Sequence, residues 1–146
     1  GGAPGSAWRN AALAQVTRGA GLVEASAGDR LRLAGFTLDV LSPEPDQVDP
    51  GQLALRVRGP GGRSLCDLAD LDADAQAVAA PRIAALGGCD YLLLPGPGVT
   101  APVPEVLAAA RPGRYLASDA GGRLPRDLPV ASISRTSEEG TIVLPI

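Results

Sequence analysis

The chain has 146 residues, a formal net charge of −3 and no histidine, lysine or methionine. This length predicts one domain, which buries roughly 70% of its unfolded surface and holds an ordinary core without disulfides or metals. The absence of histidine excludes the commonest general base, the commonest zinc ligand and every nucleophile that depends on an imidazole. The acidic balance and scarcity of aromatic residues argue against a surface dedicated to nucleic acid.

The first residues, Gly1–Gly5, predict no local structure. Because the chain does not begin with methionine, we expect it to be part of a longer protein. Ser6 is positioned to cap a short helix that continues to Val16 and ends at Gly19. We therefore divide the chain into a tail with a short helix, residues 1–19, and a folded domain, residues 20–146.

Apolar and polar residues alternate between residues 22 and 41, a pattern typical of antiparallel strands with one solvent-exposed face. The Pro- and Asp-rich residues 42–51 predict a loop. A hairpin follows, and its turn is Gly59–Gly62. Because no helix comes after this Gly-rich turn, it does not form a phosphate-binding loop. The strands predicted in this part are 22–25, 30–33, 36–41, 52–58 and 63–69.

The second part of the chain predicts strands that alternate with helices. Asp70–Asp72 cap a helix that runs from Ala73 to about Leu86, where two glycines end it. The following run, 89–94, is almost wholly apolar, which is typical of a strand covered on both faces. Further predicted elements are a helix over 103–110, a strand over 115–118 and a closing hairpin of 130–134 with 141–144. A β-meander followed by β-α-β-α-β predicts an α/β fold with an α+β-like mixed sheet.

Carboxylates gather before the first of these helices, at Asp67, Asp70, Asp72 and Asp74. Alternate carboxylates are a feature of calcium loops, but the glycine and glutamate positions of such a loop fall on Ala75 and Pro81. The spacing therefore excludes a calcium loop. Helix capping and the favourable charge at a helix N-terminus account for these residues.

A second loop, Pro95–Gly98, connects a predicted buried strand to a helix. Ligands of α/β sheets bind beyond the carboxyl ends of parallel strands, so this loop and Asp70–Asp72 are the two candidate sites. Two of the four loop residues are prolines, which lack the backbone N–H that binds an anion. We interpret the loop as a rigid connection.

Several segments occur in an order that is typical of one family. Gly28–Pro43 has the form G-D-x-L-x-L-x-G-x-x-L-x-V-L-x-P, Leu68–Asp70 is similar to a T-G-D loop, and Asp90–Val99 is similar to D-V-L-x-V-P-H-H-G-S. Leu107–Ser118 follows a run of the form L-x-x-x-x-P-x-x-x-x-x-S, and Thr136–Ile142 resembles an ending T-x-x-x-G-x-I. Together they resemble the C-terminal half of the metallo-β-lactamase-like domain of ComEC-type DNA-internalisation (competence) proteins.

This resemblance implies one half of an αββα sandwich with two divalent metals, such as zinc or manganese, between its halves. It places Asp70 at the position of the metal-bridging aspartate. Gly96 and Pro97 stand where the family has two histidines, and Leu124 stands where it has a third. A working member needs imidazoles from both halves to hold its metals. The resemblance therefore implies a vestigial Asp70, no bound cofactor and no catalytic residue.

The function expected from this resemblance is a catalytically degenerate domain of a membrane DNA-uptake protein, which acts as a structural or interaction module. One alternative is a residual phosphodiesterase or nuclease that holds Mg²⁺ with Asp70 and Asp72, since Mg²⁺ accepts all-oxygen ligands. Another is a small nucleotide-binding α/β module that uses the Gly96–Thr100 loop. These alternatives remain open at this point.

The expected partner is the remainder of a larger membrane protein, with this domain outside the cytoplasm. No stretch of the chain has the roughly 20 apolar residues that a membrane span needs, so we expect no insertion by this segment. Weak contact with DNA could involve strand arginines, although their alternation is typical of a solvated face. These arginines are Arg30, Arg32, Arg56 and Arg58. Cys66 and Cys89 are expected to be small buried thiols rather than a disulfide bridge.

Overall fold

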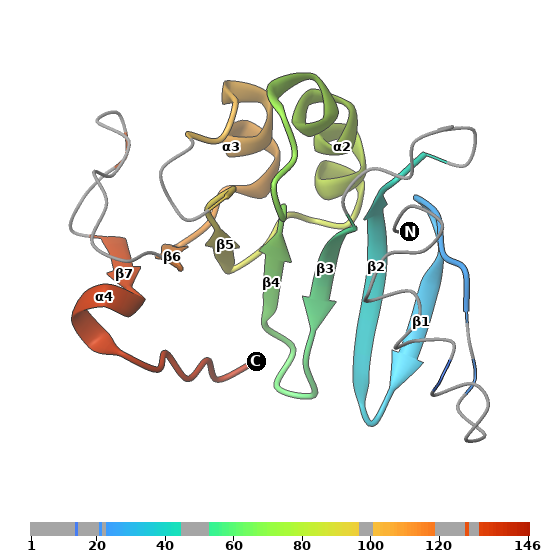
Figure 1. Cartoon of the computed structure of the whole chain (residues 1–146), viewed down its shortest axis with the longest axis horizontal. Helices are drawn as coiled ribbons and strands as arrows, with labels where there is room; N and C mark the ends of the chain where they lie inside the picture. The colour runs from blue at the N-terminus through green and yellow to red at the C-terminus, as the bar shows by residue number, and fades with distance from the viewer. Residues whose placement is uncertain are drawn as a thin grey trace.

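The structure is a computed structural model that describes residues 14, 21, 23–44, 53–96, 101–118, 128 and 132–146. Within these residues the chain forms a seven-stranded mixed sheet with helices packed against it, an α/β fold (Figure 1). The strands are β1 (Arg30–Leu33), β2 (Phe36–Ser42), β3 (Ala54–Arg58), β4 (Ser64–Asp67), β5 (Tyr91–Leu93), β6 (Arg114–Ala117) and β7 (Ile133–Arg135). The helices are α2 (Ala73–Ala85), α3 (Pro104–Ala110) and the single turn α4 (Thr136–Glu139).

The strands follow one another across the sheet in the order in which they occur in the chain. Strands β1 to β4 are antiparallel neighbours, whereas β4 to β7 are parallel neighbours. The tight turn between β1 and β2 uses Gly35 at φ +88°, a conformation that glycine adopts without steric cost. The predicted meander followed by β-α-β-α-β is confirmed for the described residues between 30 and 117.

Helices α2 and α3 lie side by side on the same face of the sheet (Figure 1). Crossovers between parallel strands are right-handed, so two crossovers that move in one direction along a sheet must lie on one face. The core between this face and the helices is made of Leu41, Ala54, Cys66, Leu68, Leu71, Ala79, Ala80, Ile83, Cys89, Leu92, Val106 and Ala110. Within the described residues, none of the helices is long and apolar enough to cross a membrane.

The opposite face of the sheet carries a row of apolar side chains, because successive residues of a strand point to opposite faces. Leu38 pairs with Val57, Val57 with Leu65, and Leu65 with Tyr91, so the row crosses four strands. Its first three members are half-buried, and Leu33 at the β1 end is 68% exposed. In the described part of the chain, no helix covers this row.

Two predicted elements differ from the structure. Residues 23–25 have no regular structure, so the strand predicted over 22–25 is wrong for its described residues. The closing hairpin is also wrong: β7 pairs in parallel with β6, the next residues form the turn α4, and 141–144 form no strand. The Ser137-Glu138-Glu139 step favours a helical turn over a hairpin because Ser and Glu favour a first helical turn.

The predicted first helix lies outside the described residues, except for Ala14, which is helical. The predicted tail, residues 1–19, lies outside them as well, apart from that residue. The other two helices begin and end close to their predicted positions. Asp72 is the N-cap of α2, and Arg111, in the left-handed conformation at φ +46°, is the C-cap of α3.

Candidate functional site

The edge of the sheet where β4 and β5 end carries the residues that the family resemblance singles out. The loop after β4 turns through Asp67, whose Oδ1 accepts a hydrogen bond from the Ala69 N–H. The Gly96 N–H donates to the Ala69 carbonyl at 2.9 Å, so Asp70 and Gly96 lie on neighbouring loops. The structure therefore brings these two positions together. Pro97 and Leu124 lie outside the described residues.

The side chains at this edge do not fit a two-metal centre. Asp70 is exposed, and Gly96 offers no side chain at all. Asp72 has a structural role: its carboxylate caps α2 by accepting a hydrogen bond from the Ala75 N–H at 2.9 Å. Among the described residues, no three His, Cys, Asp or Glu side chains form a group able to hold a metal ion. We therefore derive no hydrolytic step from this edge.

Gln76 is a buried residue at this edge that sequence reasoning missed. Its side chain is 1% exposed and lies on the core-facing side of α2. The amide Nε2 donates to the Leu71 carbonyl at 2.8 Å, and Oε1 accepts from the Val103 N–H at 3.0 Å. One amide therefore links the loop before α2 to the beginning of α3. The signal was a polar residue at helical spacing from Ala79, Ala80 and Ile83.

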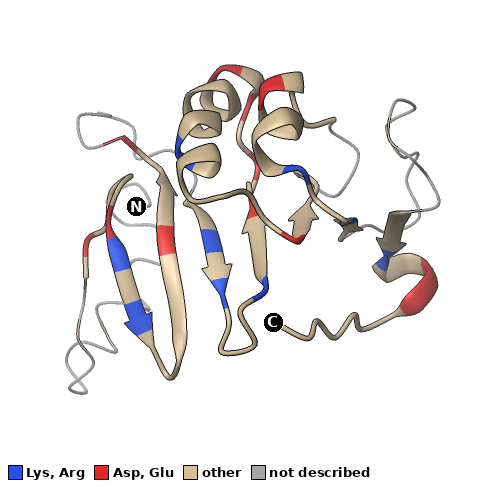
Figure 2. Ribbon diagram, turned by 180° about the vertical axis from the view of Figure 1, so that it is seen from behind, with Lys and Arg blue, Asp and Glu red and all other residues tan. Residues whose placement is uncertain are grey.

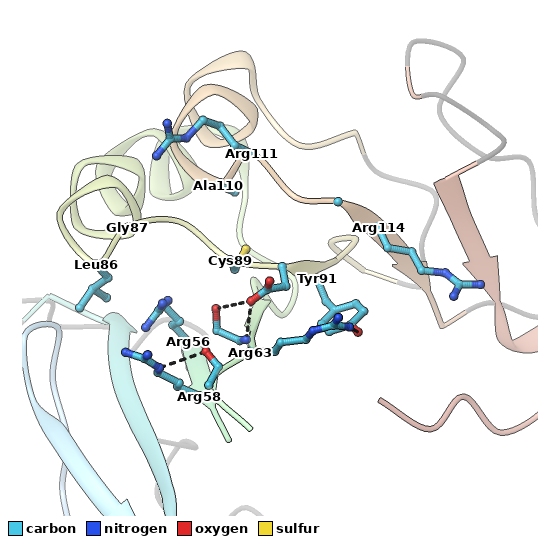
Figure 3. A pocket seen from close by; sticks show the side chains of 14 residues that line it. Arg56, Arg58, Arg63, Leu86, Gly87, Cys89, Tyr91, Ala110, Arg111 and Arg114 are labelled. Carbon is cyan, nitrogen blue, oxygen red and sulfur yellow. Dashed lines mark hydrogen bonds between the residues drawn. The ribbon is translucent and has the colours of Figure 1, made fainter. Parts of the chain in front are cut away.

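The opposite edge of the sheet, where β5 and β6 begin, holds a cavity of about 880 Å³ that we call the arginine cavity (Figure 3). Five described arginines from β3, the residue just before β4, the end of α3 and β6 line it: Arg56, Arg58, Arg63, Arg111 and Arg114. Figure 2 shows acidic residues around the first turns of α2 and α3, whereas these arginines lie toward the other end. Charge is therefore separated between the two edges of an acidic chain.

Arg56 is buried, so its assignment to a solvated face is wrong. It is 7% exposed, and its Nη1 lies 3.4 Å from Oδ2 of Asp39, which is itself 5% exposed. Its Nε donates to the Gly88 carbonyl at 2.7 Å. Arg30 reaches the other carboxylate oxygen of Asp39 at 2.5 Å and remains half-exposed. Arg56 thus joins β2, β3 and the loop after α2, while Arg32 and Arg58 are exposed as predicted.

Two polar groups on the cavity wall have fixed partners. Arg63 donates from Nη1 to the Tyr91 hydroxyl at 3.0 Å, and this hydrogen bond raises the pKa of Arg63. Oδ2 of Asp90 accepts from the Ser64 N–H at 2.8 Å (Figure 3). The single carboxylate among the described lining residues is therefore engaged with the backbone.

Cys66 and Cys89 are free buried thiols, as predicted. The neighbouring Cys89 thiol and burial together raise the pKa of Cys66. The neighbouring Cys66 thiol lowers the pKa of Cys89, because it favours the thiolate form. Cys89 lines the arginine cavity and is slightly exposed, whereas Cys66 is fully buried. Cys89 is therefore the more accessible and the more acidic of the two.

We expect iodoacetamide to modify Cys89 well before Cys66 in the folded protein, because the thiolate is the nucleophile. Since the pKa of Cys89 is lowered, its reaction rate should rise at lower pH than that of an exposed thiol. The Cys66→Ala variant loses the neighbouring thiol that lowers the pKa of Cys89, so its Cys89 should react more slowly near neutral pH. Peptide mapping by mass spectrometry measures both rates, and equal rates at the two cysteines would contradict this assignment.

Compared with models of known protein families, the chain matches none of them. No curated protein matches it either. The structure by itself therefore defines a class of fold, a mixed seven-stranded α/β sheet with two crossover helices on one face. A narrower assignment depends on the residues and surfaces described above.

Proposed function

We propose that this chain is a non-catalytic module: one half of a metallo-β-lactamase-like sandwich within a membrane DNA-uptake protein of the ComEC type. The observation that carries this proposal is the apolar row on the sheet face opposite α2 and α3. Leu38, Val57 and Leu65 lie in register on this row, and each is only half-buried. A second sheet packed about 10 Å away would bury them, as in an αββα sandwich.

The distribution of polar and apolar side chains between the two faces of the sheet supports this arrangement. Arg30 and Arg56 point to the helix-covered face, as the Asp39 and Gly88 contacts require, whereas their neighbours Leu31 and Val57 point to the opposite face. A sheet whose second face met only water would have the reverse pattern, with its polar residues on the uncovered face. The apolar residues therefore favour a partner layer over solvent at that face.

The absence of catalysis is supported by the carboxyl edge. Asp70 and Gly96 lie on loops joined by a hydrogen bond, at the edge where the resemblance implies a metal centre. One exposed carboxylate beside a glycine gives a divalent ion too few ligands for tight binding. The proposed role is therefore structural or interactive.

A nuclease assay tests the catalytic part of the proposal. We expect no cleavage of single- or double-stranded DNA by the chain in Mn²⁺, Zn²⁺ or Mg²⁺. The Asp70→Ala variant is compared with Asp74→Ala, which removes an equally exposed carboxylate from the first turn of α2. Metal-dependent cleavage that is lost in Asp70→Ala and kept in Asp74→Ala would overturn the proposal.

Cysteine labelling tests the second layer. A Val57→Cys variant reports on the apolar row, and an Arg32→Cys variant reports on an exposed position of the other face. In the chain alone, maleimide should label both introduced thiols. In the full-length protein, the thiol from Val57→Cys should be protected and that from Arg32→Cys should still be labelled. Equal labelling of both in the full-length protein would mean that no layer covers the row.

A further inference from the structure

We propose that the arginine cavity binds an oligophosphate group, such as the triphosphate of a nucleotide or an inorganic tripolyphosphate. Its arginines come from four separate parts of the fold and line one hollow of about 880 Å³. Guanidinium groups bind phosphate oxygens through paired, charge-assisted hydrogen bonds. The site lies at the edge of the sheet opposite Asp70 and is independent of the metal-site resemblance.

Three of the arginines keep donors available for a ligand. In the described part of the chain, Arg58, Arg63 and Arg111 form no ion pair with a carboxylate. Arg58 uses Nε for the Gly62 carbonyl, and Arg63 uses one terminal nitrogen for Tyr91. Their remaining N–H groups have no protein acceptor that would have to be displaced. Arg114, at the rim, approaches Glu139 only to 3.9 Å.

Asp90 is the one carboxylate among the described residues of the cavity wall, and it is hydrogen-bonded to Ser64. Its Oδ2 accepts from both the N–H and the hydroxyl of Ser64, at 2.8 and 3.4 Å. These donors offset part of its charge. Arg56 is paired with Asp39, and Arg114 approaches Glu139. Arg58, Arg63 and Arg111 therefore face one lining carboxylate, which leaves the wall cationic although the chain as a whole carries −3.

The C-terminal ends of the helices account for some of the arginines in the cavity but not for all of them. Helices α2 and α3 both finish at the cavity, and cations are favourable near helix C-termini. Arg111 is placed there, but Arg58 lies on β3 and Arg63 lies just before β4. The last carbonyls of α2 already have partners, since the Gly88 N–H donates to the Ile83 carbonyl. The strand arginines therefore need another explanation, which an anionic ligand provides.

The dimensions favour a short chain of phosphates. Pockets for small molecules usually measure about 300–1,000 Å³, which includes this cavity. Figure 3 shows Arg56, Arg58 and Arg63 on one side of the hollow, whereas the side chains of Arg111 and Arg114 extend outward at its rim. A long nucleic acid would extend beyond the cavity onto an acidic protein, which is electrostatically unfavourable.

Calorimetry with sodium tripolyphosphate and with ATP, without divalent metal and at low salt, tests the proposal. We expect saturable one-to-one binding that weakens as salt rises. The Arg58→Ala and Arg63→Ala variants should each weaken binding by about 10-fold. Arg32→Ala removes an exposed strand arginine outside the cavity and should leave the Kd unchanged. Thermal unfolding checks that each variant is folded.

The two probes distinguish the source of the phosphate. If tripolyphosphate and ATP bind with equal affinity, the site recognises the phosphates alone. If ATP binds much more tightly, the site also recognises the nucleoside. Both results support the proposed site. Three results would overturn it: no saturable binding at millimolar concentration, an equal loss in Arg32→Ala, or binding of an oligonucleotide that tripolyphosphate does not displace.

Discussion

Replacing Asp39 with alanine should lower the free energy of unfolding by about 4 kcal/mol, because it leaves the Arg56 guanidinium buried without a counter-charge. The side chain of Arg56 is 9% exposed and donates to the Gly88 carbonyl, so turning it toward water would break that hydrogen bond. The second partner, Arg30, is half-exposed and can be hydrated in place. The loss of unfolding free energy therefore comes from the buried charge of Arg56.

A double variant separates the loss of the Asp39–Arg56 ion pair from the cost of leaving the Arg56 charge buried without a partner. Asp39→Ala combined with Arg56→Met should recover more than half of the loss, since an apolar side chain is acceptable in this buried place. Urea unfolding measures all three proteins. A loss below about 1 kcal/mol in Asp39→Ala alone, the size of an exposed ion pair, would show that Arg56 is not desolvated.

Two neighbouring glycines give the second large effect. Gly88→Ala should lower the free energy of unfolding by about 4 kcal/mol, the sum of backbone strain and a steric clash. Gly88 has φ +80°, and a Cβ there would lie 2.5 Å from the Ala110 carbonyl oxygen. That oxygen accepts from the Cys89 N–H, so moving it disturbs the start of β5 as well.

Gly87→Ala is the matched control. Gly87 has φ +85°, nearly the same strain, but a Cβ there meets nothing within 4 Å. It should cost only about 1 kcal/mol. The difference between the two variants in thermal or urea unfolding measures the close approach of the loop after α2 to the end of α3. Equal losses would show that only the backbone conformation matters.

Local patterns predicted much of the fold because they depend on neighbouring residues. Alternation along Arg30–Leu33 and the pairing of Asp72 with the first turn of α2 are short-range properties. The closing hairpin failed because a short segment such as Ile133–Arg135 carries no sign of its partner strand. The resemblance at Asp70 and Gly96 stays a prediction, since nothing in the structure tests a family.

The composition of the candidate sites depends on contacts between residues that are far apart in the sequence. Arg56 has the same alternating pattern as the exposed Arg58, and only its contact with Asp39 and Gly88 shows that it is buried. Gln76 could have been noticed as a polar residue in an apolar stripe, but its link to Val103 joins residues that are 27 positions apart in the chain. The arginine cavity had no signal in the sequence, because its residues are spread from 56 to 114.

By itself the sequence determined the identity and order of most strands and helices, the N-cap of α2, and the exclusion of imidazole chemistry. Only the tertiary structure decided that the parallel strands continue the sequential order of the meander, which places both helices on one face and leaves an apolar row on the other. The physical reason is the distance along the chain over which each kind of interaction acts. Propensity and capping act within a few residues, whereas strand order and charge convergence depend on packing between distant segments.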